Sequence, residues 1–311
     1  MIDKFKFQDE VVVCLFDGHY HNGLAALVNS IVYSGFKGVI YAGYRGKLPP
    51  WVTQLKQLNE GCYSINEDIM IWFELIHTDI HLAYYKPYFI IAAAEKFSQA
   101  ATFFYFDVDI VVVAPWYFFS KWSENEVCLC SDSAFEFVSN NHPWRMDWIK
   151  LAQFKGEINL TSAYVNSGFI GVRKSAIKFI EKWLEVTELY KATGDDLTKI
   201  NQDGHNSYKG DQDLLNATIT ISPSISPSII GKEGMGFIQP AYLMLHSIAK
   251  QKPWKKNFIK HLIYYGQKPN FSEKAYFTYC KYPIKIFSKS KLFFKKANLL
   301  IATGLGRYIG Y

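Results

Sequence analysis

The chain has 311 residues, which allows one large domain with a substantial core or two smaller domains. Hydrophobic residues make up 49% of the chain and charged residues 20%, a balance that excludes extensive disorder. The five cysteines include no CxxC pair and no apolar run approaches about twenty residues, so we expect no disulfide scaffold, structural zinc site or membrane-spanning helix. The first residues also lack the apolar segment of a signal peptide, and we expect a soluble protein of a reducing compartment.

The charge is concentrated at one end of the chain. Residues 250–311 contain thirteen lysines, Arg307 and a single acid, Glu273, which gives this segment a net charge of +13. The whole chain carries only +6, so residues 1–249 carry −7. Phe, Tyr, Ile and Leu alternate with the lysines. Such a segment either binds an anionic surface or forms the solvated face of terminal helices, and the sequence leaves both readings open.

The beginning of the chain alternates between strand and helix signals. Val11–Phe16 is a short apolar run rich in β-branched residues, which indicates a strand buried on both faces. Apolar residues then recur at helical spacing from Leu24 to Ile31, and Gly35 is placed to end that helix. Val39–Tyr44 is a second predicted strand. This order predicts an α/β fold with a largely parallel sheet.

The next helix is predicted from Pro87 to Phe97, because proline suits the first turn of a helix. Phe103–Phe106 predicts a strand that runs into Asp107-Val108-Asp109 and leaves through Ile110–Val113. The motif therefore lies at the end of an apolar strand.

The second half continues in the same way. Tyr164–Val172 predicts a strand, and Ser175 is placed to cap the helix that follows it. A short helix is predicted to start at Asp211. Residues 221–240 are rich in Ser, Pro and Gly and are typical of a long surface connection.

The Asp107-Val108-Asp109 motif is the sharpest chemical signal. If the strand continued through it, both carboxylates would point to one face with Val108 on the other. Two neighbouring anions at a buried edge repel each other unless a cation lies between them, which favours a divalent metal site. The alternative is a strand that ends in solvent-exposed acids.

Three further motifs carry polar groups suited to the same site. His246 precedes Lys252-Pro253-Trp254, so an imidazole and a lysine follow each other within a short segment. Asn166, in an Asn-Ser-Gly motif, and the Asp211-Gln212-Asp213 motif offer short groups for binding sugar hydroxyls. The plain alternatives are a structural histidine, a turn at Asn166 and a helix cap at Asp211.

In this order, the motifs D-x-D, N-S-G, D-Q-D-x-L-N and H-x-x-x-x-x-K-P-W resemble those of the GT-A glycosyltransferases. The resemblance is strongest to glycosyltransferase family 8, which includes glycogenin and bacterial lipooligosaccharide galactosyltransferases. It covers about residues 10–255. It implies a GT-A (Rossmann-like) mixed, mostly parallel central sheet flanked by helices, with residues 1–255 as the catalytic domain. Residues 256–311 form a basic, aromatic C-terminal extension on which the resemblance is silent.

The resemblance implies roles for individual residues. Asp107, Asp109 and His246 would bind Mn²⁺ (or Mg²⁺), which bridges the donor diphosphate. The donor would also contact residues at the first strand and near the metal: Asp17, His19, Tyr20, Lys86, Asp107 and Lys252. Asn166, Asp211 and Gln212 would surround the transferred sugar as catalytic residues, and Asp132 would bind the acceptor.

Two positions depart from the family pattern. Ala249 replaces a glycine in the family's H-x-x-G, and His19 replaces the more usual asparagine near the base. Trp116, Trp144 and Trp148 follow the D-x-D strand and are candidates for stacking on an acceptor sugar, although most of the aromatic residues must belong to the core.

The predicted function is a metal-dependent glycosyltransferase that moves a sugar from a nucleotide-diphosphate sugar, a UDP-sugar by the resemblance, to a saccharide or glycolipid acceptor with retention. Two alternatives remain: a nucleotidyltransferase with a related sheet, and a non-catalytic binding protein with the GT-A fold. We expect a cytoplasmic protein that associates with the inner face of a membrane through residues 256–311. Nucleic acid is not an expected partner.

Overall fold

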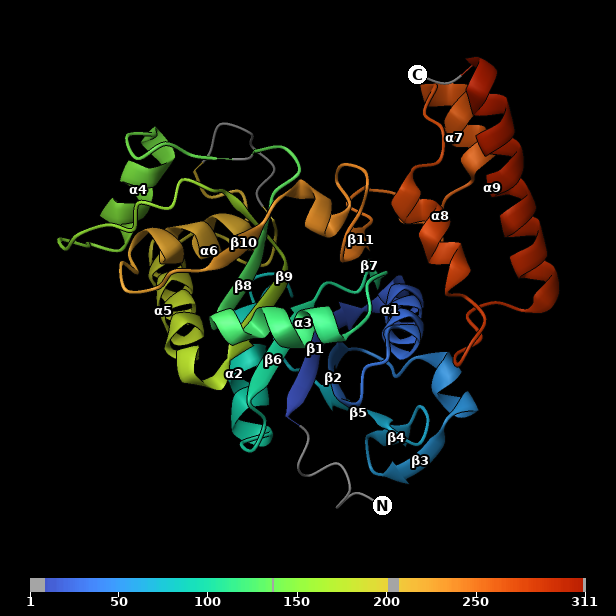
Figure 1. The fold of residues 1–311 in the computed structure, drawn as a ribbon, viewed down its shortest axis with the longest axis horizontal. Helices are drawn as coiled ribbons and strands as arrows, with labels where there is room; N and C mark the ends of the chain where they lie inside the picture. The colour runs from blue at the N-terminus through green and yellow to red at the C-terminus, as the bar shows by residue number, and fades with distance from the viewer. Residues whose placement is uncertain (1–8, 136, 201–206, 310–311) are drawn as a thin grey trace.

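The computed structural model describes residues 9–135, 137–200 and 207–309, which are built around a nine-stranded mixed sheet (Figure 1). The strands of the chain are β1 (Glu10–Asp17), β2 (Gly38–Arg45), β3 (Lys56–Asn59), β4 (Cys62–Ser64), β5 (Ile69–Leu75), β6 (Thr102–Phe106), β7 (Ile110–Val112), β8 (Val127–Ser131), β9 (Val165–Arg173), β10 (Ser228–Ile230) and β11 (Met244–His246). The order in the large sheet is β10-β8-β9-β6-β1-β2-β5-β4-β3. Its four central strands, β6, β1, β2 and β5, are parallel, and the antiparallel pairs lie toward the two edges. This is the predicted α/β architecture.

Helices cover both faces of this sheet. They are α1 (His21–Ser34), α2 (Lys86–Lys96), α3 (Tyr117–Trp122), α4 (Pro143–Leu151), α5 (Lys178–Ala192), α6 (Asp211–Thr220), α7 (Phe258–Tyr265), α8 (Phe271–Thr278) and α9 (Lys289–Ile309). Figure 1 shows α7, α8 and α9 on one side of the molecule, near β7, β11 and α1, with α4, α5 and α6 on the opposite side. The predicted end of α1 is confirmed, since Gly35 has a left-handed backbone (φ 89°) and its N–H donates to Ile31 and Val32.

The side chains of β1 alternate between two hydrophobic cores. Val11, Val13 and Leu15 pack with residues of α2, α5 and α6. Val12, Cys14 and Phe16 pack with residues of α1 and α3 on the other face. All six are almost fully buried, as predicted for this apolar run.

Two local predictions for the second half were wrong. Ser175 does not cap a helix: it lies in a 3₁₀ turn, its hydroxyl contacts the Glu126 carboxylate, and α5 begins three residues later without a side-chain cap. The segment 221–240 is not only a surface connection, because Ser228–Ile230 pairs in parallel with Cys128–Cys130 at the edge of the sheet. A three-residue edge strand among serines and prolines is too short to show a periodic pattern.

The basic C-terminal segment shares a core with the rest of the chain. Trp254 and Phe258 pack with Ala26 of α1 and Leu245 of β11. The amide of Asn29 in α1 also donates to the carbonyl groups of Tyr279 and Ile284 and accepts from the Ile284 N–H. The predicted boundary at residue 255 therefore falls inside a continuous core, and the division into two parts stays a prediction.

Among the described residues, no helix combines the length and the apolar composition that crossing a bilayer requires.

Candidate active site

The D-x-D motif lies in a turn between two strands. β6 ends at Phe106, the Asp107 N–H donates to the Gly168 carbonyl at 2.7 Å, and the Ile110 N–H donates back to the Asp107 carbonyl at 3.1 Å. The expectation that a continuing strand would place both acids on one face was therefore wrong. The turn brings the two carboxylates together instead.

His246 completes the cluster. It is the last residue of β11, and its antiparallel pairing with Ile110 holds it beside the turn. Its Nε2 lies 3.1 Å from Asp109 Oδ1 and 3.9 Å from Asp107 Oδ2. One ligand atom from each of the three residues lies within 4.8 Å of the other two, so the structure brings the predicted metal ligands together.

The close packing of this histidine depends on a glycine. A Cβ atom added at Gly168 would lie 2.5 Å from His246 Cε1 and 2.8 Å from Asn166 Oδ1. Carbon atoms do not approach that closely, so a side chain here would displace the imidazole or the amide. Gly168, the glycine of the Asn-Ser-Gly motif, therefore leaves the space that His246 and Asn166 occupy at the site.

Two buried lysines neutralise the acidic groups. Lys86 Nζ lies 3.1 Å from Asp107 Oδ1 and 2.8 Å from Asp211 Oδ2, and it also donates to the Ser167 carbonyl at 3.0 Å. Lys252 Nζ lies 2.6 Å from Asp109 Oδ2. Asp211, the first residue of α6, therefore forms an ion pair with Lys86. The N-cap of this helix is Gly210, so Asp211 is not a helix cap.

These pairs shift the acidity of the groups. Burial favours neutral Lys86, but the carboxylates of Asp107 and Asp211 outweigh it and raise the lysine's pKa. Burial likewise opposes ionisation of Asp109, while His246 and Lys252 outweigh it and lower the pKa of this carboxyl. Asp211 follows the same pattern, since Lys86 overcomes its burial and lowers its pKa. These ion pairs keep Lys86, Asp109 and Asp211 charged in the folded protein.

Three polar side chains form a linked group on the other side of the site. Asn166 Nδ2 donates to Asp132 Oδ1 at 2.9 Å and to Gln212 Oε1 at 3.0 Å. Asp132 is itself buried and accepts from the backbone N–H groups of Ala134 and Phe135. In this structure Asp132 orients Asn166, and its contact with an acceptor stays a prediction.

The predicted base-binding residues gather after β1. Asp17 Oδ2 accepts from Arg45 at 2.7 Å, and the rings of His19 and Tyr20 stack with their centroids 4.8 Å apart. The Trp254 Nε1–H group donates a hydrogen bond to His19 Nδ1 at 2.9 Å. Burial, followed by the charge of Lys255, lowers the pKa of His19, which favours this accepting neutral form.

These groups enclose a cavity of about 340 Å³, the size of small-molecule sites. Its lining includes most of the predicted site residues: Asp17, Tyr20, Lys86, Asp107, Asp109, Asn166, Asp211, Gln212 and His246. His19, Asp132 and Lys252 lie behind this lining and contact it through Tyr20, Asn166 and Asp109.

Sequence reasoning missed three polar residues that line the cavity. The Tyr105 hydroxyl donates to Asp107 Oδ1 at 3.0 Å, and its place two residues before Asp107 in the strand was a usable signal. Ser167 contacts Lys86, and it lies inside the quoted Asn-Ser-Gly motif. His81 comes from an irregular loop, where no pattern in the sequence marks it.

Of the three tryptophans considered for sugar stacking, two belong to the core. Trp116 packs against Phe104 and Phe119, and Trp148 is 1% exposed. Those two predictions were wrong, because burial leaves no ring face for a ligand. Trp144 is half-buried, and the Lys209 ammonium lies 3.8 Å from its ring centroid.

The donor atoms suit a hard or borderline divalent cation. Two carboxylates and one imidazole converge, which is a combination that Mn²⁺ and Mg²⁺ accept with water or phosphate in the remaining positions. The charge of Asp109 is fixed by its neighbours, so its ligand atom stays deprotonated over the whole ordinary pH range.

The sheet order, the strand-end carboxylates and the histidine from a distant strand agree with the GT-A fold expected from the motifs. No protein-family model and no curated protein matches the sequence. Solved structures do match. The bifunctional glycosyltransferase WbbM has a TM-score of 0.56 at 15% identity, over 93% of this chain and 52% of WbbM. An active-site glutamine-to-glutamate mutant of LgtC has a TM-score of 0.52 at 11% identity, over 90% of this chain and 98% of LgtC.

The glycosyltransferase GlyE of Streptococcus pneumoniae TIGR4 has a TM-score of 0.50 at 16% identity, over 94% of this chain and 64% of GlyE. The chain thus spans about half of WbbM and about two thirds of GlyE, but nearly all of LgtC. At these identities the likeness shows the fold, and it confirms the GT-A architecture predicted from the motifs.

Proposed function

We propose that the protein is a metal-dependent glycosyltransferase that moves a sugar from a nucleotide-diphosphate sugar to a saccharide or glycolipid acceptor. One observation carries the proposal. Asp107, Asp109 and His246 come from separate parts of the chain and converge beside two buried lysines, in a cavity that also exposes Gln212. A metal and fixed cations at one place stabilise the negative charge that grows on a diphosphate as it leaves a sugar.

The metal-side residues hold the leaving group. Asp107, Asp109 and His246 would hold Mn²⁺ or Mg²⁺, which would supply Lewis-acid stabilisation of the departing diphosphate. Lys86 lines the cavity beside Asp107, so its ammonium is placed to meet a phosphate oxygen, while Lys252 lies behind Asp109 and adds positive charge to the metal side of the site. Their fixed positions mean that little reorganisation accompanies the growth of negative charge.

The sugar-side residues orient the transferred group. Asn166 and Gln212 are tied together and face the cavity, and Asp211 is held next to them by Lys86. Gln212 is a neutral amide and takes no proton from an acceptor hydroxyl. We propose front-face attack: the acceptor oxygen bonds to the anomeric carbon, the bond to the diphosphate breaks, and a phosphate oxygen of the leaving group takes the proton. This course retains the anomeric configuration. LgtC also has an active-site glutamine, which supports the assignment.

We propose that the nucleotide base lies over Tyr20, with Asp17 as a hydrogen-bond acceptor at its edge. Both line the cavity, and the stack with His19 gives Tyr20 a fixed ring face. UDP is the expected nucleotide from the resemblance. His19 acts here by holding Trp254 and Tyr20 in place.

The alternatives fit less well. A nucleotidyltransferase uses a basic, glycine-rich loop after its first strand, and residues 17–23 contain no lysine or arginine. A non-catalytic binding protein has no need of an assembled set of two carboxylates and a histidine with matching lysines.

The acceptor is proposed to reach the site from a membrane surface. On α9 the side chains of Phe293, Phe294, Leu300 and Tyr308 are all more than half exposed, and lysines occur among them. An aromatic and basic helix face of this kind binds anionic lipid, with each lysine contributing about 1 kcal/mol near the surface. We propose a cytoplasmic enzyme that associates peripherally with the inner face of a membrane. Replacing Phe293 and Phe294 with serine should lower co-sedimentation with anionic vesicles, and unchanged co-sedimentation would contradict the membrane part.

The test of the function is release of nucleotide from a panel of UDP-glucose, UDP-galactose, their N-acetyl forms and GDP-sugars, with and without Mn²⁺. We expect metal-dependent release from a UDP-sugar and its loss in the Asp107→Ala/Asp109→Ala variant. Release of pyrophosphate from a nucleoside triphosphate would favour the nucleotidyltransferase, and binding of UDP-sugar without turnover would favour the binding protein.

A further inference from the structure

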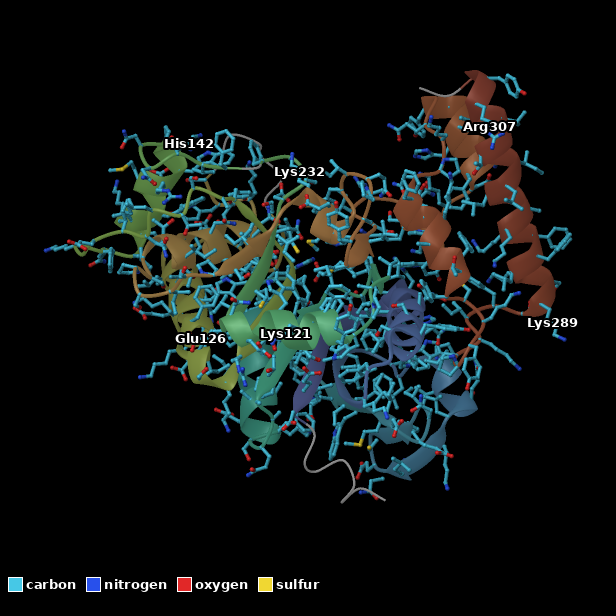
Figure 2. All side chains as sticks on the ribbon, viewed as in Figure 1. Lys121, Glu126, His142, Lys232, Lys289 and Arg307 are labelled. Atoms are coloured by element: carbon cyan, nitrogen blue, oxygen red, sulfur yellow. The ribbon has the colours of Figure 1, made fainter. Side chains whose placement is uncertain are left out.

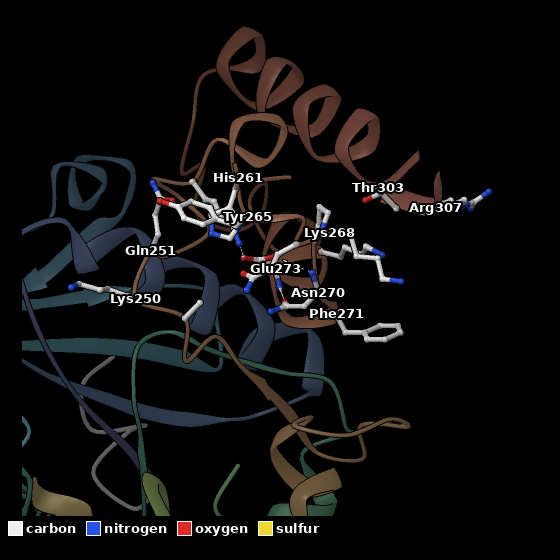
Figure 3. A pocket seen from close by; sticks show the side chains of 15 residues that line it. Lys250, Gln251, His261, Tyr265, Lys268, Asn270, Phe271, Glu273, Thr303 and Arg307 are labelled. Atoms are coloured by element: carbon white, nitrogen blue, oxygen red, sulfur yellow. Dashed lines mark hydrogen bonds and ion pairs between the residues drawn. The ribbon is translucent and has the colours of Figure 1, made fainter. Parts of the chain in front are cut away.

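A second and larger cavity lies among the C-terminal helices, outside the candidate active site. It has a volume of about 930 Å³ and lies between the loop after β11 and helices α7, α8 and the end of α9 (Figure 3). Its lining contains five cationic side chains and one acidic side chain: Lys250, Lys256, Lys268, Lys274, Arg307 and Glu273. A cavity of this size has room for a drug-sized or disaccharide-sized ligand.

The single acid of this cavity is already occupied. Glu273 Oε1 accepts from Lys256 Nζ at 2.6 Å, and Oε2 accepts from the Asn270 N–H at 2.9 Å in the capping box of α8. Both Lys256 and Glu273 are almost fully buried. Figure 3 shows Glu273 and Asn270 in the middle of the cavity, with Gln251 on one side and Phe271 on the other. The Lys256–Glu273 ion pair therefore adds no net charge to the lining of the cavity.

The remaining cations have no such partner. Within the described residues, no carboxylate lies at ion-pair distance from Lys250, Lys268, Lys274 or Arg307. Figure 3 shows the Lys250 and Arg307 side chains directed away from the middle of the cavity, and Lys268 and Lys274 on the same lining give its partly apolar wall a positive potential. An anion of small size and high charge is the ligand that this field favours.

The rest of the wall suits a sugar. Phe271 and Tyr265 are each more than half exposed and line the cavity, and the Lys274 ammonium lies 5.6 Å from the Phe271 ring centroid. His261 stacks at a tilt on Tyr265, and its buried Nδ1 makes no hydrogen bond within the described residues. Asn270 and Gln251 also line the cavity and carry amide groups. A flat lipid surface would not need this combination of depth, amides and ring faces.

We infer that this cavity is a binding site for a phosphate-bearing saccharide, with Lys268 and Lys274 as phosphate contacts and Phe271 as a stacking surface. The site adjoins the candidate active site through one loop: Ala249, Lys250 and Gln251 line the cavity, and the next residue, Lys252, bonds to Asp109. The inference concerns binding and holds whether or not the protein transfers sugar.

The test is calorimetric titration of the full chain with glucose 1-phosphate, with glucose as the neutral control. We expect saturable binding of glucose 1-phosphate and none of glucose. The Lys268→Gln/Lys274→Gln variant should bind at least about tenfold more weakly, since each lysine makes a charge-assisted hydrogen bond to phosphate. The matched control is Lys281→Gln/Lys289→Gln, which removes two lysines of the same segment that do not line the cavity. Figure 2 shows Lys289 at the opposite end of α9 from Arg307.

Three results would overturn the inference. The first is equal binding by the cavity variant and the wild type. The second is displacement of glucose 1-phosphate by UDP with Mn²⁺, which would place it in the donor site. The third comes from vesicles of phosphatidylcholine with and without phosphatidylglycerol: if the cavity variant loses vesicle binding while glucose 1-phosphate does not bind at all, the lysines serve a lipid surface. The measurements need no transfer activity, so failure of the proposed enzyme function leaves the inference testable.

Discussion

The strand-end site and the C-terminal cavity use lysine in opposite ways. In the strand-end site, Lys86 and Lys252 are buried and each is paired with aspartates at hydrogen-bond distance. In the C-terminal cavity, Lys256 is paired with Glu273, and within the described residues no carboxylate lies at ion-pair distance from the other cations of the lining. Balanced charge suits a site that takes up a metal together with a diphosphate, whereas an excess of positive charge suits an anion alone.

The largest expected effect comes from a substitution that disrupts the strand-end site and leaves the C-terminal cavity unchanged. Asp109→Ala should reduce metal-dependent nucleotide release by at least about a thousandfold, because it removes a metal ligand and leaves Lys252 without its partner. Binding of glucose 1-phosphate should stay as in the wild type. Glu181→Gln, an exposed acid on α5, is the matched control. Full activity of Asp109→Ala would refute the proposed metal site.

Next in size is the buried pair of the second region. Lys256→Gln leaves the Glu273 carboxylate buried without its cation, which typically costs about 3–5 kcal/mol. We expect a lower free energy of unfolding in urea and early loss of the C-terminal helices by hydrogen exchange. The double variant Lys256→Gln/Glu273→Gln should recover most of the loss, since it removes both charges. No recovery would mean that packing, not charge, holds this pair.

Asp213 offers a third case for comparison, a buried acid whose hydrogen bonds come from a hydroxyl and a backbone N–H. Asp213 accepts from the Tyr164 hydroxyl at 2.6 Å and from the Lys209 N–H at 2.7 Å, and burial raises its pKa to about 6. The folded state therefore holds this proton more tightly than the unfolded chain, whose pKa is near 3.8. The resulting stability is complete below pH 4 and is lost as the pH rises through about 6, by up to about 3 kcal/mol.

The measurement is the free energy of unfolding at pH 4.5 and pH 7.5 for the wild type and Asp213→Asn. The variant should show a smaller loss between the two pH values, because its amide does not ionise. Asp147→Asn, at an exposed position, serves as the control. An unchanged difference between the two pH values would show that Asp213 is already ionised in the acidic sample.

The smallest effect tests the close packing at the metal site. Gly168→Ala places a methyl group 2.5 Å from His246 Cε1, so the imidazole must shift. Overpacking of this kind costs about 1–3 kcal/mol, and we expect a loss of metal affinity of about tenfold or more by titration with Mn²⁺. Gly304→Ala in α9 is the control, since nothing lies within 4 Å of the added atom. Equal affinity in both variants would show that the histidine does not need its present position.

Most of the fold was predictable because the core strands are short apolar runs with clear breaks. Val11–Phe16 could only be a strand buried on both faces, and Gly35 ended α1 as expected. Ser175 and the strand at Ser228–Ile230 were not predictable in the same way. A possible cap is decided by where the helix packs, and an edge strand by the partner that it meets.

The motifs indicated residues that the fold does bring together, but not how these residues contact one another. Asp107, Asp109 and His246 were chosen from their motifs, yet the turn that joins the carboxylates replaced the expected strand. Nothing in the sequence indicated that Lys86 bridges Asp107 and Asp211, or that His19 holds Trp254. His81 lay outside every motif.

The sequence by itself determined which chemical groups are available and which segments must be buried, because hydrophobic periodicity and strand-end motifs act over short distances along the chain. The tertiary structure decided which acid meets which lysine. It placed His246 beside Asp109 across more than a hundred residues, and it left Lys268 and Lys274 with no carboxylate at ion-pair distance among the residues that the structure describes. Charges interact through space within a few ångströms, and only the packed fold sets those distances.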